Sequence, residues 1–214
     1  KKKFLVIFRG INVDYFDQST ILETDEKKLL EKWQITKEKK IILMPGRLTS
    51  WKGQELLIEA INLVKIELGY EAFNVVILGS DQGRNLYRKK LVRLIDQYRL
   101  TNQIKLIDNC KNMALAYKVS DIVISASIEP EAFGRVAVET QSMEKLIIAS
   151  NIGGSNETII NGKTGFLFES GDAVSLSKQI IRAITMDDHS LGLIGKEGRK
   201  NIIKKFNVEK MCFS

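Results

Sequence analysis

The sequence predicts a doubly wound α/β domain, a Rossmann-like parallel sheet of about six strands with helices on both faces. Two observations predict it. From residue 41 onward, short apolar runs rich in β-branched side chains alternate with amphipathic segments of helical length. These runs are continuously apolar, which is typical of strands that are buried on both faces of a parallel sheet.

The elements follow one another in a regular order. Residues 3–16 open with a short apolar strand, and the polar stretch 17–40 is expected to form a surface helix and then a linker. We therefore divide the chain into an interdomain segment and linker (1–40), a Rossmann-like domain (41–186) and a C-terminal helix packed on that domain (187–214). The expected strands are 41–45, 73–79, 104–107, 121–125, 146–150 and 165–168, and the expected helical segments are 53–69, 86–100, 112–120, 134–145, 153–162, 172–186 and 190–205.

Composition places the chain among ordinary globular proteins. Its 214 residues are 44% hydrophobic and 28% charged, and no apolar run approaches the roughly 20 residues that span a bilayer. Cys110 and Cys212 match no metal or redox spacing, which favours a reducing, cytoplasmic compartment.

The formal net charge of +7 is concentrated in four basic stretches, at 1–3, 37–40, 84–93 and 196–205. Such stretches are typical of solvated helix faces, and they also attract anionic substrates or a negative membrane surface. They are not interleaved with stacking aromatics, and no nucleic-acid-binding signature accompanies them. We therefore expect no nucleic-acid partner.

In a doubly wound domain, ligands bind outside the carboxyl ends of the strands. The loop after the first regular strand is "GRLTSWKG", residues 46–53. Gly46 allows the backbone to turn, Arg47 and Lys52 supply two cations, and Gly53 opens a helix with unpaired amides. This combination suits a diphosphate, although the spacing is neither a P-loop nor a dinucleotide fingerprint. The alternative is that both cations are plain surface charges.

Four further loops follow strands. In "GSDQGRN", Gly79 and Gly83 favour a compact turn that Asp81 could cap, and a position beside a nucleotide is the alternative. In "SNIGGSNET", the adjacent glycines 153 and 154 indicate either another close approach to a ligand or tight helix packing. The remaining two are "DNCKN" and "ASIEPEAFGR".

The stretch "EPEAFGRVAVE", residues 129–139, has the most informative composition. Pro130 prevents an early helix start, so we expect a helix from Phe133 or Gly134 through Glu139 to Glu144. Free amides at the start of this helix would point into the cleft, and Gly134 would leave room for a ligand's oxygens. An anion is therefore expected there.

Two glutamates flank that anion position. Glu139 falls in the second turn, roughly 7 to 9 Å from the helix start at 1.5 Å per residue. Its carboxylate could accept hydrogen bonds from the vicinal hydroxyls of a ribose, and Glu131 could do the same for a sugar. The ligand implied is a sugar joined through phosphate to a nucleoside. The alternative is a helix cap plus a solvated helix face.

These residues resemble a known family. "PGRLTSWKGQELLIEAI", "VVILGS", "SDIVISASIEPEAFGRVAVETQSMEKLIIASNIGGSNETIINGKTGFLF" and "FRGINVDYF" look like the C-terminal donor-binding domain of retaining GT-B glycosyltransferases of the family-four type, glycosyl transferases group 1. The resemblance runs from about residue 6 to residue 186. The sequence departs from the family's usual glycine and proline at Glu144 and Leu146, which concerns a turn rather than the ligand contacts.

The resemblance implies a role for each site residue. Arg47 and Lys52 would hold the diphosphate and, with Glu131 facing the donor sugar, form the catalytic group. Glu139 would hold the ribose. The backbone from Phe133 through Gly134 and Arg135 to Val136 would contact sugar or phosphate, and Gly46 and Gly79 would line the nucleotide. No cofactor and no divalent metal are expected, because fixed cations and helix amides stabilise the leaving group.

The resemblance also implies a reaction. The donor would be a nucleoside diphosphate sugar, a UDP-sugar first and a GDP- or ADP-sugar as alternatives. A hexosyl unit would pass with retention to a saccharide or lipid-linked acceptor, in cell-envelope glycan or lipopolysaccharide biosynthesis. The acceptor-binding N-terminal GT-B domain does not precede residue 1, so we expect half an enzyme, inactive unless that domain is supplied in cis or in trans. We expect a cytoplasmic location, with peripheral contact at the inner face of the membrane.

Two other function classes fit the same fold. A non-catalytic nucleotide-binding module would keep the sheet and the nucleotide without transferring sugar. A dinucleotide-dependent oxidoreductase would carry a glycine fingerprint after the first regular strand, and "PGRLTSWKG" lacks it.

Overall fold

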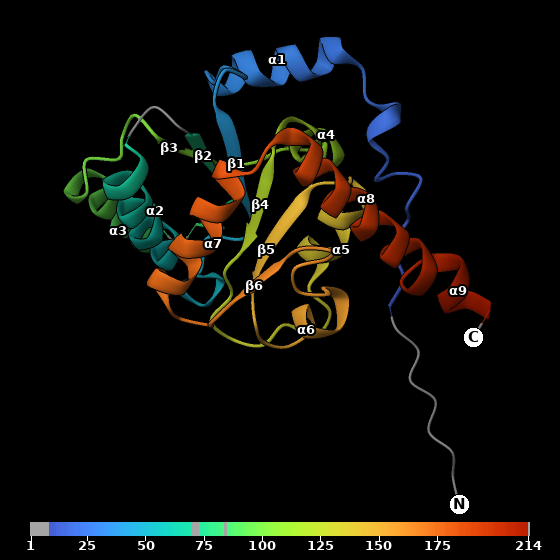
Figure 1. The fold of residues 1–214 in the computed structure, drawn as a ribbon. Helices are drawn as coiled ribbons and strands as arrows, with labels where there is room; N and C mark the ends of the chain where they lie inside the picture. The colour runs from blue at the N-terminus through green and yellow to red at the C-terminus, as the bar shows by residue number, and fades with distance from the viewer. Residues whose placement is uncertain (1–8, 70–72, 84, 214) are drawn as a thin grey trace, which may run out of the picture.

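The computed structural model describes residues 9–69, 73–83 and 85–213, so the apolar strand expected at the start of the chain lies outside the described residues. Six parallel strands form one sheet in the order β3-β2-β1-β4-β5-β6, which confirms the predicted fold class (Figure 1). The strand order reverses between β1 and β4, and this is where doubly wound domains bind ligands. The strands are β1 (Lys40–Pro45), β2 (Phe73–Leu78), β3 (Ile104–Ile107), β4 (Ile122–Ser125), β5 (Leu146–Ser150) and β6 (Phe166–Phe168).

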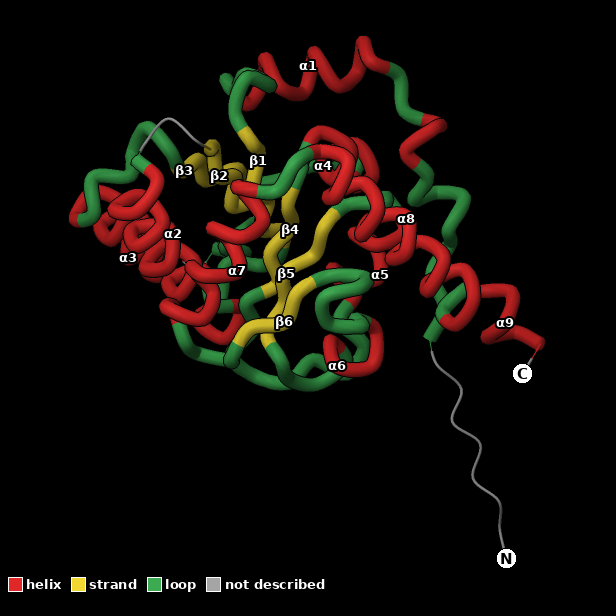
Figure 2. Tube along the Cα trace, in the orientation of Figure 1, coloured by secondary structure: helices red, strands yellow, loops and turns green. Residues whose placement is uncertain are grey.

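Helices cover both faces of the sheet, as Figure 2 shows by colour. Successive residues of a strand point to opposite faces, and Ile42 and Met44 accordingly lie in one apolar cluster and Ile41 and Leu43 in the other. The first cluster packs against α2 (Gln54–Leu68), α3 (Asn85–Gln97) and α7 (Ala173–Thr185), and the second against α4 (Met113–Val119) and α5 (Arg135–Ser142), with α1 (Glu23–Trp33) and α8 (Asp188–Lys205) beside them.

Several predicted helices are shorter in the structure than expected, and α6 and α5 show why. Instead of a helix over 153–162, α6 spans only Ser155–Thr158, because the chain becomes extended at Ile159 and turns at once into the 161–165 bridge. Instead of reaching Glu144, α5 ends at Ser142. Glu144 adopts a left-handed conformation, with φ of 53°. The Glu144 amide then donates to the Gln141 carbonyl and the Lys145 amide to the Thr140 carbonyl, a Schellman helix end.

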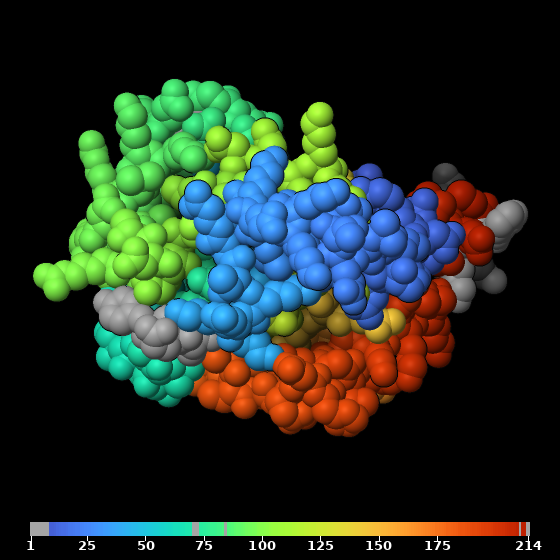
Figure 3. All heavy atoms as spheres, turned by 90° about the horizontal axis from the view of Figure 1, so that it is seen from above, coloured from blue at the N-terminus to red at the C-terminus, as the bar shows by residue number. Residues whose placement is uncertain are grey.

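The N-terminal segment is integrated with the rest of the described chain. The backbone of Ile11 exchanges hydrogen bonds with Phe206 and Val208, and Arg199 donates to the carbonyl of Phe16 and to Asp17. Leu29, Leu30 and Trp33 of α1 are buried. Seen from above in Figure 3, the blue residues of this segment spread over the molecule and meet the red C-terminal helices. The domain boundaries proposed from the sequence remain a prediction.

The remaining elements are short. They are η1 (Gln18–Thr20), η2 (Ser50–Lys52) and α9 (Val208–Phe213), the last of which the sequence pattern did not predict. None of the helices in the described ranges combines the length and the apolar composition needed to cross a bilayer.

Candidate functional site

A cavity of about 370 Å³ lies at the carboxyl ends of the strands, beside the point where the strand order reverses. Its size falls within the range typical of small-molecule sites. The loops after β1, β2 and β3 contribute to its wall together with α4 and α5. Six of the ten residues selected from the sequence line it, namely Gly46, Arg47, Gly79, Arg135, Val136 and Glu139.

The loop after β1 is fixed by contacts that glycine makes possible. Gly53 has φ of 78°, and a Cβ there would lie 1.9 Å from the carbonyl oxygen of Ala126, at the end of β4. The Gln54 side chain donates to the carbonyl of Arg47 at 2.9 Å. The loops after β1 and β4 are thereby held against each other, which sets the position of Arg47.

Lys52 and Glu131 meet outside the wall of this cavity, in an ion pair of 2.8 Å. The Ser127 hydroxyl also donates to Glu131. The Lys52 chain passes Gly46, where an added Cβ would lie 3.7 Å from Lys52 Cδ. Trp51 lies beside both cations, with its ring centroid 4.4 Å from Lys52 Nζ and 5.9 Å from Arg47 Cζ. The two predicted diphosphate ligands therefore share one neighbourhood, and the predicted sugar ligand is paired with one of them.

The start of α5 carries the row of free amides. Gly134 is the left-handed N-cap, with φ of 70°, and among the described residues the backbone amides of 133–136 have no protein acceptor. A Cβ on Gly134 would have its nearest neighbour at 3.7 Å, so the protein itself leaves this position uncrowded. Unpaired amides at a helix start favour an anion.

Gly153 and Gly154 pack against the loop that leads into α5. The Gly154 amide donates to the Glu131 carbonyl at 2.7 Å, and a Cβ on Gly153 would lie 2.6 Å from the same oxygen. The sequence left open a close approach to a ligand or tight helix-to-sheet packing, and the packing in the structure is against loop backbone at 130–133 rather than against the sheet. The partner is the loop that carries Glu131.

Glu139 is buried, with 6% of its surface exposed, and both carboxylate oxygens are engaged. Tyr117 donates its hydroxyl to Oε2 at 2.7 Å, and Arg135 donates to Oε1 through Nη2 at 2.7 Å and Nε at 3.1 Å. Burial and the neighbouring carboxylate raise the pKa of Tyr117 well above its ordinary value, so it remains a donor. The hydrogen bonds that Arg135 donates to Glu139 raise the pKa of Arg135 as well.

Phe133 lies away from the main cavity. Its ring is 6.1 Å from that of Phe206, and it lines a smaller cavity of about 230 Å³ that shares Arg135 and Glu139 with the main one. Only its backbone is placed to take part in the row of amides.

Sequence reasoning missed Tyr117, the guanidinium of Arg135 and the wall supplied by Asp108, Asn109 and Cys110. The loop "DNCKN" had been recognised as a strand-end loop, which was the only available signal for that wall. Burial raises the pKa of the Cys110 thiol, so this side chain is a protonated thiol rather than a thiolate. In the described part of the chain, no three histidine, cysteine, aspartate or glutamate side chains gather in a way that could hold a metal ion.

With this geometry in view, comparison with known proteins assigns the family. The model for glycosyl transferases group 1 matches residues 25–205. The chain belongs to this family. The membership predicted from the motifs is thus confirmed, and with it the GT-B resemblance of the fold.

Individual relatives and solved structures show the extent of the match. The capsular polysaccharide biosynthesis glycosyltransferase CapM of Staphylococcus aureus is 27% identical over 188 residues, covering 87% of this chain and 48% of CapM. A glycosyltransferase structure from Rickettsia africae ESF-5 has 38% identity and a TM-score of 0.91, covering 97% of this chain and 54% of that one. HepE from Anabaena, solved in complex with UDP and glucose, has 25% identity and a TM-score of 0.86, with the same coverage. This group 1 chain spans about half the length of these relatives.

Proposed function

We propose that this chain binds a nucleoside diphosphate sugar, with a UDP-sugar as the donor, in the cavity at the carboxyl ends of the strands. The observation that carries the proposal is that Arg47, Glu139 and the first two residues of α5, Arg135 and Val136, line one cavity at the carboxyl ends of the strands. HepE, solved with UDP and glucose and also with UDP-glucose, supports the choice of nucleotide.

The diphosphate would lie between the β1 loop and the start of α5. Arg47 and Lys52 would neutralise the charge that develops on the departing diphosphate, and the amides of 133–136 would stabilise it without reorganising. Lys52 is paired with Glu131 in the structure at 2.8 Å. A phosphate bound beside Lys52 would compete for that cation and leave Glu131 to accept hydrogen bonds from the donor sugar.

Glu139 would hold the ribose in a fixed orientation. Tyr117 fixes one carboxylate oxygen from within the core, whereas the Arg135 side chain is 69% exposed and free to rotate away from the other. Because a carboxylate offers about four lone-pair positions, ribose hydroxyls could replace or join Arg135 at Oε1. Tyr117 is therefore a positioning residue in this proposal.

The complete reaction would be hexosyl transfer with retention to a saccharide or lipid-linked acceptor in envelope glycan synthesis, at the cytoplasmic side of a membrane. The acceptor would be held by an N-terminal GT-B domain supplied in cis or in trans. On this proposal the 214-residue chain binds donor without transferring sugar.

Calorimetric titration with UDP, GDP, ADP and NAD tests the proposal. Glu139→Ala should weaken UDP binding at least tenfold, which is about 1.4 kcal/mol. Glu129→Ala is the matched control, since Glu129 is an exposed glutamate in the loop that leads into α5, and it should leave affinity unchanged. Glu139→Gln is a second variant in case Glu139→Ala does not fold, because the glutamine side chain still offers Tyr117 a hydrogen-bond acceptor. Absence of saturable binding by every nucleoside diphosphate, or equal affinity of wild type and Glu139→Ala, would contradict the assignment.

A further inference from the structure

A second cavity lies at the opposite end of the sheet, where the strands begin. It measures about 480 Å³ and is lined by four lysines, two glutamates and Leu30. The lysines come from separate segments: Lys27 from α1, Lys37 from the loop before β1, Lys118 from α4 and Lys145 from the turn before β5. With four amines against two carboxylates, the lining carries excess positive charge, and its single apolar residue disfavours an apolar ligand.

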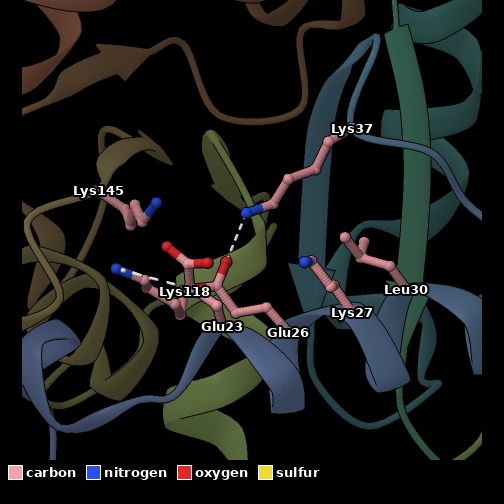
Figure 4. Close-up of a pocket in the computed structure, with 7 residues that line it drawn as sticks. All are labelled: Glu23, Glu26, Lys27, Leu30, Lys37, Lys118 and Lys145. Atoms are coloured by element: carbon pink, nitrogen blue, oxygen red, sulfur yellow. Dashed lines mark hydrogen bonds and ion pairs between the residues drawn. The ribbon is translucent and has the colours of Figure 1, made fainter.

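Three of these amines surround one space, as the close-up in Figure 4 shows. Glu26 is buried, with 5% of its surface exposed. Its carboxylate forms an ion pair with Lys37, and its Oε1 lies 3.9 Å from Lys118 Nζ. Glu23 and Glu26 supply two carboxylates against the four lysines of the lining, so an excess of positive charge remains.

Lys145 lies near the carboxylates of Asp121 and Glu26 without a direct ion pair to either. It is largely withdrawn from solvent, and within the part of the chain that the structure describes it forms no ion pair. Burial is the largest influence on its pKa and lowers it to about 8. Asp121 and Glu26 oppose this shift, whereas Lys118 and Lys37 add to it. These carboxylates offset the desolvation of the Lys145 cation only in part, so a further anion beside it would be stabilising.

We propose that this cavity binds a phosphomonoester dianion, held by Lys37, Lys118 and Lys145. A phosphate offers three equivalent terminal oxygens and two charges, which matches three amines from three directions, whereas a single carboxylate offers two oxygens. The site is distinct from the donor cavity. Its lysines lie before β1, near the end of α4 and before β5, which is where strands begin, whereas the donor cavity lies where the strands end.

Calorimetry with inorganic phosphate at constant ionic strength tests this site on the full chain. Saturable binding should weaken at least tenfold in Lys145→Met and in Lys118→Gln. Lys28→Met is the matched control, since Lys28 is an exposed lysine of α1 outside the lining, and it should bind as wild type does. Arg47→Ala should also bind as wild type does, which separates this site from the donor cavity. At pH 8, binding should take up protons in wild type and not in Lys145→Met, because the bound dianion keeps that amine charged.

A vesicle arm distinguishes the source of the phosphate. Binding of the protein to vesicles containing phosphatidic acid is compared with binding to phosphatidylcholine vesicles. If the protein binds the phosphatidic acid vesicles, and this binding is lost in Lys145→Met and displaced by inorganic phosphate, the ligand is a lipid headgroup. If the protein does not bind these vesicles, the ligand is a soluble phosphorylated molecule. The proposal is overturned by undetectable phosphate binding at millimolar concentration, by binding that survives Lys145→Met, or by loss in Arg47→Ala or Lys28→Met.

Discussion

The two ends of the sheet treat charge differently. At the carboxyl ends, Lys52 is paired with Glu131, and Glu139 is held by both Tyr117 and Arg135. At the amino ends, Lys145 is half-buried among Lys37, Lys118, Glu26 and Asp121 and forms no ion pair within the described chain. A charged side chain that is paired within the protein is held in one orientation, whereas a half-buried charge whose desolvation is only partly offset is stabilised further when an anionic ligand binds. Both ends are therefore compatible with anion binding, but for different physical reasons.

The largest effect on the free energy of unfolding is expected at two glycines, one at each end of the sheet, that pack closely against backbone. A Cβ on Gly79 would lie 1.8 Å from the Gly46 carbonyl oxygen, and one on Gly195 would lie 2.0 Å from that of Glu144. Gly79→Ala and Gly195→Ala should each lower the free energy of unfolding by about 3 kcal/mol, measured by urea denaturation, because backbone must move to relieve either clash. Only Gly79→Ala should also weaken UDP binding in the protein that remains folded.

Gly192→Ala provides the control in the same helix as Gly195. A Cβ there meets no atom within 4 Å, so the change should be neutral or should stabilise by up to about 1 kcal/mol. If Gly195→Ala and Gly192→Ala have equal free energies of unfolding, α8 does not pack on the turn before β5 as described.

An intermediate effect is expected from pH at the amino end. The pKa of Lys145 falls from 10.5 to about 8 on folding, so between these values the unfolded chain binds more protons than the folded chain does. Stability must then rise with pH across that window, and the penalty for burying the charge is fully present below pH 8. The charged groups facing Lys145 are Glu26, Lys37, Lys118 and Asp121, with Glu144, Asp188 and Lys196 in the adjoining cavity.

Urea denaturation of wild type and Lys145→Met at pH 7.5 and pH 10 isolates this contribution. Wild type should gain about 1 to 3 kcal/mol relative to the variant between the two values. Phosphate should reduce that gain, because it stabilises the charged amine. A constant difference between the two proteins would show that Lys145 is not desolvated.

The smallest effect is expected at the helix end next to Lys145. Glu144 has φ of 53°, while its carboxylate accepts a hydrogen bond from Gln18 at 2.9 Å and lies 3.8 Å from Arg199. Glu144→Ala should destabilise by about 1 kcal/mol, because it loses these contacts and keeps the unfavourable backbone. Glu144→Gly should be about 1 kcal/mol more stable than Glu144→Ala in thermal and urea unfolding. The reverse order would mean that the left-handed conformation carries no penalty here.

The sequence by itself determined the parallel sheet, because continuous apolar runs separated by amphipathic segments have few other stable arrangements. It also placed Arg47, Gly79 and the start of α5 in loops at strand ends, because nearby glycine and proline residues mark where strands end and turns begin. The tertiary structure alone decided which distant side chains meet. Tyr117 reaches Glu139 across 22 positions, and the lysine cavity is assembled from four segments. Local periodicity specifies where an element begins and which face it buries, but not the neighbours that packing brings to that face.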